Sequence, residues 1–318
     1  MNCQECDGPT KKFGRDRDGN QRFRCPACKA TFTEPHEKKP RLVGNMILTE
    51  DKIISCLQHL VEGCSIRSTE RLTGVHRDTI LRLLETAGKK CETVMNERIK
   101  SLRVSEVECD EQWQYIGMKQ KTRNRKGITD ESVGDSWVFT AFERNSKLIL
   151  AWHLGHRTES DTIIFTDRLA RATTGSFQVT TDGFRPYQHA IVLSLGVQRV
   201  DFAQLVKLYT NNPDGPQTRY SPAECTGAKK VPIYGNPDME RVSTSHVERH
   251  NLSTRMSSRR YTRLTNAFSK SWIKHYAALS LWYAYYNFCR VHRSLRVTPA
   301  MEAGITDHIW ALKELLAA

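Results

Sequence analysis

The residues best suited to chemistry in this chain begin with two cysteine pairs. Cys3 and Cys6 form one Cys-x-x-Cys pair, and Cys25 and Cys28 form a second pair after an interval of 18 residues. Each pair makes a tight turn whose two thiolates can reach one tetrahedral ion. Because all four ligands are cysteines and no coordination position is left for a substrate, the spacing predicts a structural zinc ion. A redox role for one pair is the alternative.

Three acids, Asp110, Asp182 and Glu248, are the candidates for a second kind of site. Asp110 and Asp182 follow apolar and β-branched runs typical of buried strands, where a carboxylate needs a partner or a metal ion. Taken singly, either aspartate is equally well interpreted as a capping residue. With Glu248 on a following helix, they become three oxygen donors around one sheet, a set that favours Mg²⁺ or Mn²⁺. Two such ions, ~3.5–4 Å apart, would activate the attacking oxygen and stabilise the leaving oxygen of a phosphoryl transfer.

Other acids compete for this role. Glu108 lies on the same side of the predicted strand as Asp110, whereas strand alternation directs Glu111 to the opposite side. Asp201 falls in a segment that could be a neighbouring strand, and Glu224 falls in a stretch rich in Pro and Gly.

The charge distribution indicates a polyanionic partner. The chain has a net charge of +13, and residues 249–296 contain ten lysines and arginines without an acid. Residues 119–126 add five more positive charges. Such concentrated positive charge is typical of proteins that bind nucleic acid, and a basic protein kept soluble by its charge is the alternative. Downstream of Glu248, helical spacing and position favour five contacts to DNA: Asn251, Arg255, Arg259, Arg260 and Arg263.

Residues 48–95 predict three helices with a glycine-containing turn at 73–75. Short helices joined in this way are typical of a helix-turn-helix, in which the start of the last helix enters the major groove. A plain three-helix packing unit is the alternative. The candidate DNA readers on the last helix are His76, Arg77, Asp78, Thr79 and Arg82.

The elements that must position the acids are expected after residue 99. Sequence periodicity predicts a mixed sheet flanked by helices, and a loop-like insertion at 209–241. The predicted strands are 104–117, 136–144, 147–156 and 176–184, and the predicted helices are 158–173, 187–195, 243–258 and 270–288. No apolar run approaches the ~20 residues of a membrane-spanning helix, and the N-terminus lacks the apolar core of a secretory signal. We therefore expect a cytoplasmic protein.

Six motifs give the chain a resemblance to the transposases of bacterial and archaeal insertion sequences, specifically the insertion-sequence-1 type of DDE transposase. These motifs are GNQRFRCPACKATFT, GVHRDTI, ECDEQW, TTDGFRPY, SHVERHNLSTR and YYNFCRVHRSLRVTPAMEAG. The resemblance implies a ribonuclease-H-like catalytic core in which Asp110, Asp182 and Glu248 are the catalytic triad that binds Mg²⁺. It also implies three domains: a zinc ribbon at 1–40, a helix-turn-helix domain at 41–98 and the catalytic domain at 99–318.

The family mechanism implies how such a protein acts on DNA. Water cleaves at the transposon ends to expose 3′-hydroxyl groups, which then attack a target phosphodiester without a covalent protein–DNA intermediate. The ribbon and helix-turn-helix would bind the terminal inverted repeats of double-stranded DNA, and pairing of two ends implies at least a homodimer. The expected location is the nucleoid.

Three other functions are weighed against this one. A tyrosine recombinase is disfavoured because Leu295 stands where its His-x-x-Arg element, starting at His292, needs arginine. A transposase-derived DNA-binding regulator without catalysis is the second alternative. A structure-specific nuclease on the same fold is the third.

Overall fold

The computed structural model of the protein describes residues 1–16, 19–34, 42–44, 46, 48–209, 225–262 and 265–318. Its internal contacts divide the chain into two compact units, Met1–Glu50 and Asp51–Ala318. The smaller unit contains an antiparallel sheet of β1 (Lys11–Arg15), β2 (Gln21–Arg24) and β3 (Thr31–Thr33). Among the described residues of this sheet, the only contact between two aromatic rings is the stack of Phe23 on Phe32, at 6.1 Å between ring centroids. Because so little apolar surface is buried, this unit needs another source of folding free energy.

The second unit begins with three helices, α1 (Glu50–Val61), α2 (Ile66–Thr73) and α3 (Arg77–Arg98). Ser65 caps the start of α2 by accepting a hydrogen bond from the backbone N–H of Ser68. Gly74 ends α2 in the left-handed conformation, with φ 68°, which glycine adopts without steric cost. The turn therefore reverses the chain between α2 and α3, as the sequence predicts.

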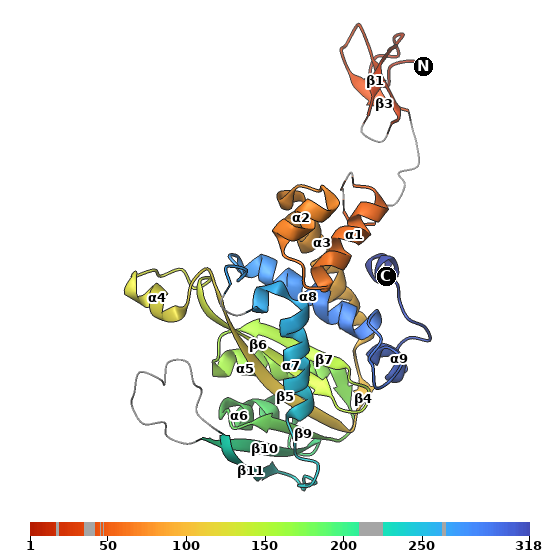
Figure 1. The fold of residues 1–318 in the computed structure, drawn as a ribbon. Coiled ribbons are helices and arrows are strands. Elements are labelled where there is room, and N and C mark those ends of the chain that lie inside the picture. Colours follow the sequence, from red (N-terminus) through yellow and green to blue (C-terminus); the bar gives the residue numbers. More distant parts are fainter. Residues whose placement is uncertain (17–18, 35–41, 45, 47, 210–224, 263–264) are drawn as a thin grey trace. The chain divides into compact units, whose positions relative to one another are not determined.

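A six-stranded mixed sheet forms the centre of the second unit, in the order β11-β10-β9-β5-β6-β7 (Figure 1). β5 pairs antiparallel with β6 and parallel with β9, while β9 pairs parallel with β10. The strands are β5 (Glu106–Ile116), β6 (Gly134–Glu143), β7 (Ile149–Gly155), β9 (Phe177–Asp182), β10 (Val200–Tyr209) and β11 (Cys225–Tyr234). Two short strands, β4 (Leu102–Arg103) and β8 (Thr173–Thr174), pair separately.

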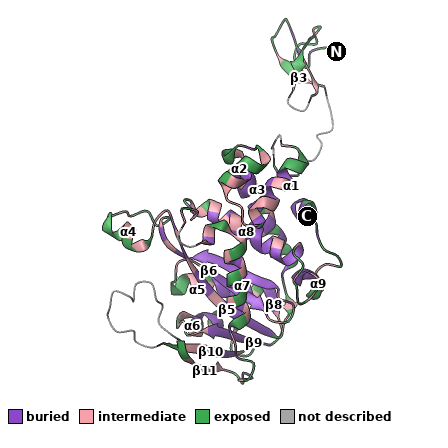
Figure 2. Cartoon of the chain, viewed as in Figure 1, coloured by how far each residue is buried: buried purple, intermediate pink, exposed green. Residues whose placement is uncertain are grey.

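Helices cover both faces of the sheet, and the central strands are buried between them (Figure 2). On one face, Phe139 of β6 contacts Phe165 of α5 (Glu159–Ala172), which in turn contacts Tyr187 of α6 (Pro186–Leu195). On the other face, Phe142 contacts His250 of α7 (Ser245–Ser257).

α8 (Trp272–Phe288) completes the second layer of helices. It packs along α3, where Gly88 faces the backbone of Ala277. From the same helix, the Asn287 side chain accepts a hydrogen bond from the backbone N–H of Ile149 and donates one to the carbonyl of the same residue. The amide of Asn287 thus takes the place of a further strand beside β7.

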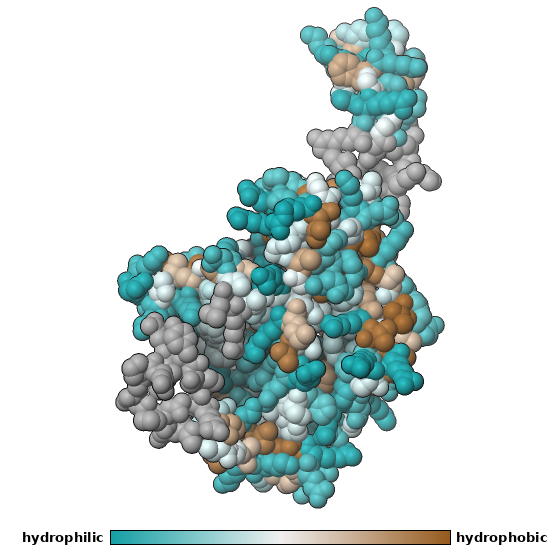
Figure 3. All heavy atoms as spheres, viewed as in Figure 1, coloured by the Kyte–Doolittle hydropathy of each residue, from teal (hydrophilic) through white to brown (hydrophobic). Residues whose placement is uncertain are grey.

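The remaining elements are α4 (Gln120–Arg125), a 3₁₀ turn at Arg259–Tyr261, α9 (Pro299–Glu302) and α10 (Leu312–Ala317). In the view of Figure 3, the outward side of α2 is mainly hydrophilic. Among the described residues, no helix combines the length and the apolar character that crossing a membrane requires.

The predicted mixed sheet flanked by helices is confirmed. The predicted insertion at 209–241 is wrong in part, because residues 225–234 form β11, which pairs with β10. Lysines and a proline in β11 masked the strand pattern, and this edge strand is largely exposed, so it lacks the apolar alternation of a buried one. Residues 210–224 of that prediction lie outside the described part of the chain.

Candidate functional site

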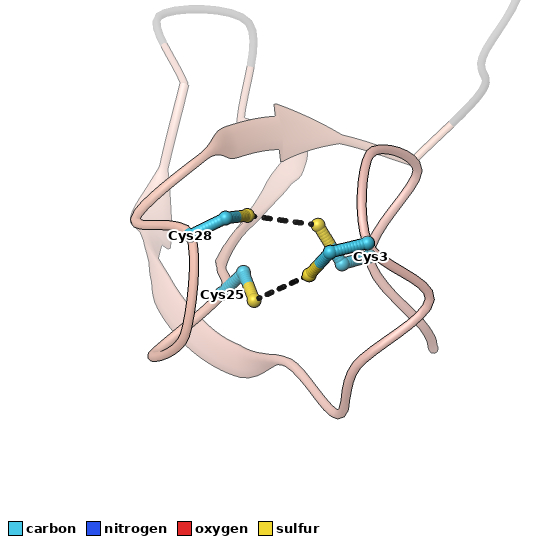
Figure 4. A group of neighbouring side chains, drawn as sticks. Cys3, Cys25 and Cys28 are labelled. Carbon is cyan, nitrogen blue, oxygen red and sulfur yellow. Dashed lines mark hydrogen bonds between the residues drawn. The ribbon is translucent and has the colours of Figure 1, made fainter.

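Four cysteine thiols converge in the smaller unit (Figure 4). The Sγ atoms of Cys3, Cys6, Cys25 and Cys28 all lie within 4.8 Å of one another. Cys3 and Cys28 are 3.4 Å apart at their sulfurs, and Cys6 and Cys25 are 3.5 Å apart. The backbone N–H of Cys28 helps to lower the pKa of Cys25 to about 7, whereas the hydrogen bond with Cys3 and burial help to raise the pKa of Cys28 to about 12. The predicted cluster is confirmed, and it could bind a structural zinc ion.

Asp110 lies in the middle of β5, on the face covered by α7. Its Oδ2 accepts a hydrogen bond of 2.7 Å from the Nδ2 of Asn251. Burial, together with the negative charges of Asp182 and Glu248, raises the pKa of Asp110 to about 7. This carboxyl group therefore lies where a positive charge would be stabilising.

Asp182 is the last residue of β9, the strand beside β5. Thr181 pairs with Cys109, so the register brings Asp182 level with Asp110 on adjacent strands, which lie ~4.8 Å apart. The Nη2 of Arg157 is 3.6 Å from Asp182 Oδ2. The Arg157 guanidinium also stacks on Phe184, at 4.2 Å from the ring centroid. A cation is thus held against this carboxylate from the start of α5.

Glu248 lies in the first turn of α7 and faces the same side of the sheet. Its Oε1 accepts hydrogen bonds of 2.6 Å from both the Nζ of Lys207 and the hydroxyl of Thr244. The Glu248 side chain is 40% exposed, so the ion pair with Lys207 is partly solvated. Each of the three acids therefore has its own donor: an amide, a guanidinium or an ammonium group.

The three acids interact electrostatically, but their carboxylate oxygens do not converge as the cysteines do. Among the described residues, the cysteine cluster is the only group of three or more His, Cys, Asp or Glu side chains close enough to hold a metal ion. Glu248 is turned toward Lys207 of β10 instead of toward Asp110. The structure thus places Asp110 and Asp182 next to each other on adjacent strands, whereas Glu248 lies nearby on α7 and binds Lys207.

The competing acids have other partners. Glu108 accepts hydrogen bonds from the backbone N–H groups of His246 and Val247 at the start of α7, and from the His246 ring. Asp201 accepts from the backbone N–H of Asn236. Both carboxylates thus hold neighbouring segments in place, while Glu224 lies outside the described residues.

Glu111 points to the opposite face of the sheet, as strand alternation predicts. It is buried, and Arg157 contacts it at 3.2 Å. Burial and then the charge of Asp182 raise the pKa of Glu111 to about 8. The Arg157 guanidinium is therefore shared between Glu111 and Asp182.

Sequence reasoning missed Arg157 and Lys207, the two cations that contact the acids. Arg157 follows β7 and Lys207 lies in β10, so neither is near an acid of the triad in sequence. Nothing in their local sequence distinguishes them from other surface cations.

The predicted DNA readers lie where α3 begins. His76, Arg77, Asp78 and Arg82 are exposed, and Thr79 is half-buried. Asp78 is already close to His76, at 3.6 Å, and to Arg77, at 3.9 Å. The structure therefore gathers these five residues at one exposed helix start.

A cavity of about 970 Å³ lies between the first three helices and the segment from α7 to α8. Among its lining residues, Asp78 is the only acid. The cations that line it are Arg67, Arg77, Arg259, Arg260, Lys270 and Lys274. Two of the predicted DNA contacts, Arg259 and Arg260, thus line the same basic cavity as residues of the first three helices. Arg263 lies outside the described residues.

Asn251 and Arg255 are the other predicted DNA contacts. Asn251 is bound to Asp110 through its amide, so its side chain supports the acid site directly. Arg255 lines a second, smaller cavity of about 550 Å³ beside the end of β5.

In comparisons with known proteins, no family model and no curated protein matches the chain.

Proposed function

We propose that the protein is a DDE transposase of the insertion-sequence-1 type, which cuts at transposon ends and joins the exposed 3′-hydroxyl groups to target DNA. The observation that carries this proposal is the level pairing of Asp110 and Asp182 on adjacent strands, with Glu248 at their border. The mixed sheet with helices on both faces supports a ribonuclease-H-like core. The surrounding positive charge supports DNA as the substrate.

The residues at this site fit a divalent metal ion by their chemistry. They offer carboxylate oxygens, the donors preferred by Mg²⁺ and Mn²⁺. Burial and like charge raise the pKa of Asp110, which is the condition that a bound cation relieves. Asp110, Asp182 and Glu248 would hold the two ions after Glu248 exchanges Lys207 for metal. The ions would supply activation of the attacking oxygen and stabilisation of the leaving oxygen.

The remaining parts of the chain support recognition of DNA ends. The four-cysteine unit is proposed to be a zinc ribbon, and α2, the Gly74 turn and α3 to be a helix-turn-helix. The exposed start of α3 supports entry into a major groove. The partner is double-stranded DNA, and since two ends must be paired, the active form is at least a homodimer. A protein of this kind acts in the cytoplasm at the nucleoid.

The test compares Asp182→Asn with Asp201→Asn, a matched change in the neighbouring strand β10. Each protein is incubated with Mg²⁺, DNA carrying the cognate terminal repeats and a supercoiled target. We expect joined products from the wild type and Asp201→Asn. Asp182→Asn should bind the ends in a gel-shift assay without joining them.

Three outcomes would contradict the proposal. Full joining of the DNA ends by Asp182→Asn would show that Asp182 is not part of the catalytic site. A covalent protein–DNA adduct would indicate a tyrosine recombinase, and cleavage without any joining would indicate a nuclease.

A second function, a DNA-binding regulator without catalysis, is favoured because each of the three acids already binds a different side chain of the protein. Calorimetric titration with Mn²⁺ distinguishes the two functions independently of activity. A transposase should bind Mn²⁺, and Asp110→Asn should weaken that binding. A regulator should bind the ends and show no metal binding that depends on Asp110.

A further inference from the structure

The last residues of β5 are paired on one edge only, with β6. β5 pairs with β9 only from Glu106 to Cys109, so the strand beyond Asp110 has no β9 partner along that edge. This part of β5 forms one wall of the cavity of about 550 Å³. The opposite wall comes from the segment that follows α7 and precedes α8.

Four aromatic residues line this cavity, and three of them, Trp113, Tyr115 and Phe268, lie in a row. Tyr115 lies 4.7 Å from Phe268 and 5.8 Å from Trp113 between ring centroids, with interplanar angles of 40° and 43°. All three side chains are half-buried, unlike the fully buried Phe139 of the same sheet. The rings are therefore partly exposed, and a flat ligand can stack on them where the neighbouring lysines leave a ring face open.

The cavity is also positively charged, and none of its lining residues is acidic. Lys119, which lines the cavity, lies 5.8 Å from the Trp113 ring centroid, and Lys270, which lines the larger cavity, lies over Phe268. Arg260 donates a hydrogen bond to the hydroxyl of Ser269, and among the described residues no carboxylate pairs with it. Burial lowers the pKa of Arg260 to about 10, so the guanidinium is still charged at neutral pH and favours an anion.

One polar atom in the wall has no partner. Gln114 is 4% exposed and donates its Nε2–H to the carbonyl of Arg260, but its Oε1 is buried without a hydrogen bond among the described residues. An unpaired buried acceptor is costly, and a ligand N–H group would satisfy it. Every DNA base has an N–H group on its pairing edge.

We propose that this cavity binds an unpaired nucleobase of DNA, stacked on Trp113, Tyr115 and Phe268, with the adjoining phosphate near Lys119 and Arg260. Base stacking on aromatic rings beside a cationic groove is the usual way in which proteins bind single-stranded DNA. The inference rests on the proposed function, because it names what part of the DNA the site takes.

The position of the cavity relates it to the acid site. Trp113 follows Asp110 by three residues, or ~10 Å along an extended strand. That distance corresponds to about three base steps of B-form DNA. Because strand alternation turns Trp113 to the opposite side of β5 from Asp110, a DNA strand whose phosphate lies at the acids would deliver an unpaired base to the aromatic row by passing around the edge of β5 that β9 leaves unpaired.

The test uses two 12-residue probes without divalent metal: oligothymidylate and the matching oligomer of abasic sites, which keeps the phosphates and lacks the bases. Fluorescence anisotropy measures the dissociation constant of each probe. We expect the wild type to bind oligothymidylate at least about 5-fold more tightly than the abasic oligomer. Trp113→Leu and Phe268→Leu should lose most of this preference without weakening binding of the abasic oligomer.

Two control variants separate stacking from folding. Trp113→Phe keeps an aromatic ring and should keep most of the preference. Tyr234→Leu removes an aromatic ring of β11 that stacks with Phe202 at 6.4 Å, far along the sheet order from β5, and should leave the preference unchanged. Circular dichroism of each variant reports its folding.

Equal binding of the two probes by the wild type would overturn the nucleobase cavity. So would an equal loss of affinity for both probes in Trp113→Leu. In either case, metal-dependent joining of DNA ends that is lost in Asp182→Asn would leave the proposed transposase function standing. A base preference that persists while the wild type fails to join ends would support the cavity and refute the transposase function.

Discussion

Substitution of Gly88 by alanine should destabilise the second unit, although alanine is the better helix former. Gly88 lies inside α3 at its crossing with α8. An added Cβ would lie 2.6 Å from the Cα of Ala277, 2.7 Å from its carbonyl oxygen and 2.8 Å from its Cβ. Because two of these atoms belong to the backbone, no side-chain rotation relieves the clash, and the two helices must move apart.

The size of the effect follows from two opposing contributions. Overpacking of a close contact costs about 1–3 kcal/mol in the free energy of unfolding. Replacing glycine by alanine within a helix returns about 1 kcal/mol. Since the contact is with backbone, we expect the cost to lie in the upper part of its range and the net loss to be about 1–2 kcal/mol. For a unit of this size, the melting temperature should fall by about 2–4 °C.

Urea unfolding followed by circular dichroism measures this change, with Thr93→Ala as the matched control. Thr93 is an exposed residue of the same helix, so its replacement should stabilise the protein by a few tenths of a kcal/mol. If Gly88→Ala were as stable as the wild type or more so, α3 and α8 would not cross at this contact. Gly88→Leu should be more destabilised than Gly88→Ala, and the reverse order would also refute the reasoning.

Three further predictions concern metal, pH and an ion pair. The purified protein should carry about one zinc ion per chain by mass spectrometry of the metal, and Cys25→Ser should lose it; equal zinc content in both proteins would contradict the site. Burial lowers the pKa of His275 to about 3 in the folded protein, whereas the ordinary pKa of 6.5 applies in the unfolded chain. Below pH 6.5 the unfolded chain therefore binds a proton that the folded protein does not bind, and the free energy of unfolding should fall as the pH is lowered. Between pH 6.5 and 5, His275→Gln should lose about 1.5 kcal/mol less stability than the wild type, and parallel pH profiles would show that His275 is not the cause. Glu106 is buried and bound by Arg144 and Arg241, so Glu106→Gln should cost about 1.5–3 kcal/mol, whereas replacing the exposed Glu240 by Gln should cost almost nothing; similar unfolding curves for the two variants would refute this.

The central strands could be predicted because their sequences alternate or run apolar between clear turn signals. The β6–β7 hairpin follows from two β-rich runs around Arg144, Asn145 and Ser146. The positions of Asp110 and Asp182 could be predicted for the same reason, since each is fixed by the strand that carries it.

The partners of the acids could not be predicted. Lys207 binds Glu248, which lies 41 residues further along the chain. This contact depends on the register between β9 and β10, which the position of Lys207 in the sequence does not reveal. Likewise, Phe268 meets Tyr115 only after α7 and the 3₁₀ turn have returned the chain to β5. Contacts of this kind depend on how the elements pack, which local periodicity does not encode.

Both edges of the central sheet are protected against the addition of another strand. At β7, the Asn287 amide occupies both hydrogen-bonding groups of Ile149. At β11, the exposed strand carries Lys229 and Lys230, and Pro232 has no N–H to donate. Open edges otherwise recruit strands from other chains and lead to aggregates. Copies of this protein brought close together would therefore have to associate through helices or loops, and extension of the sheet from copy to copy is disfavoured.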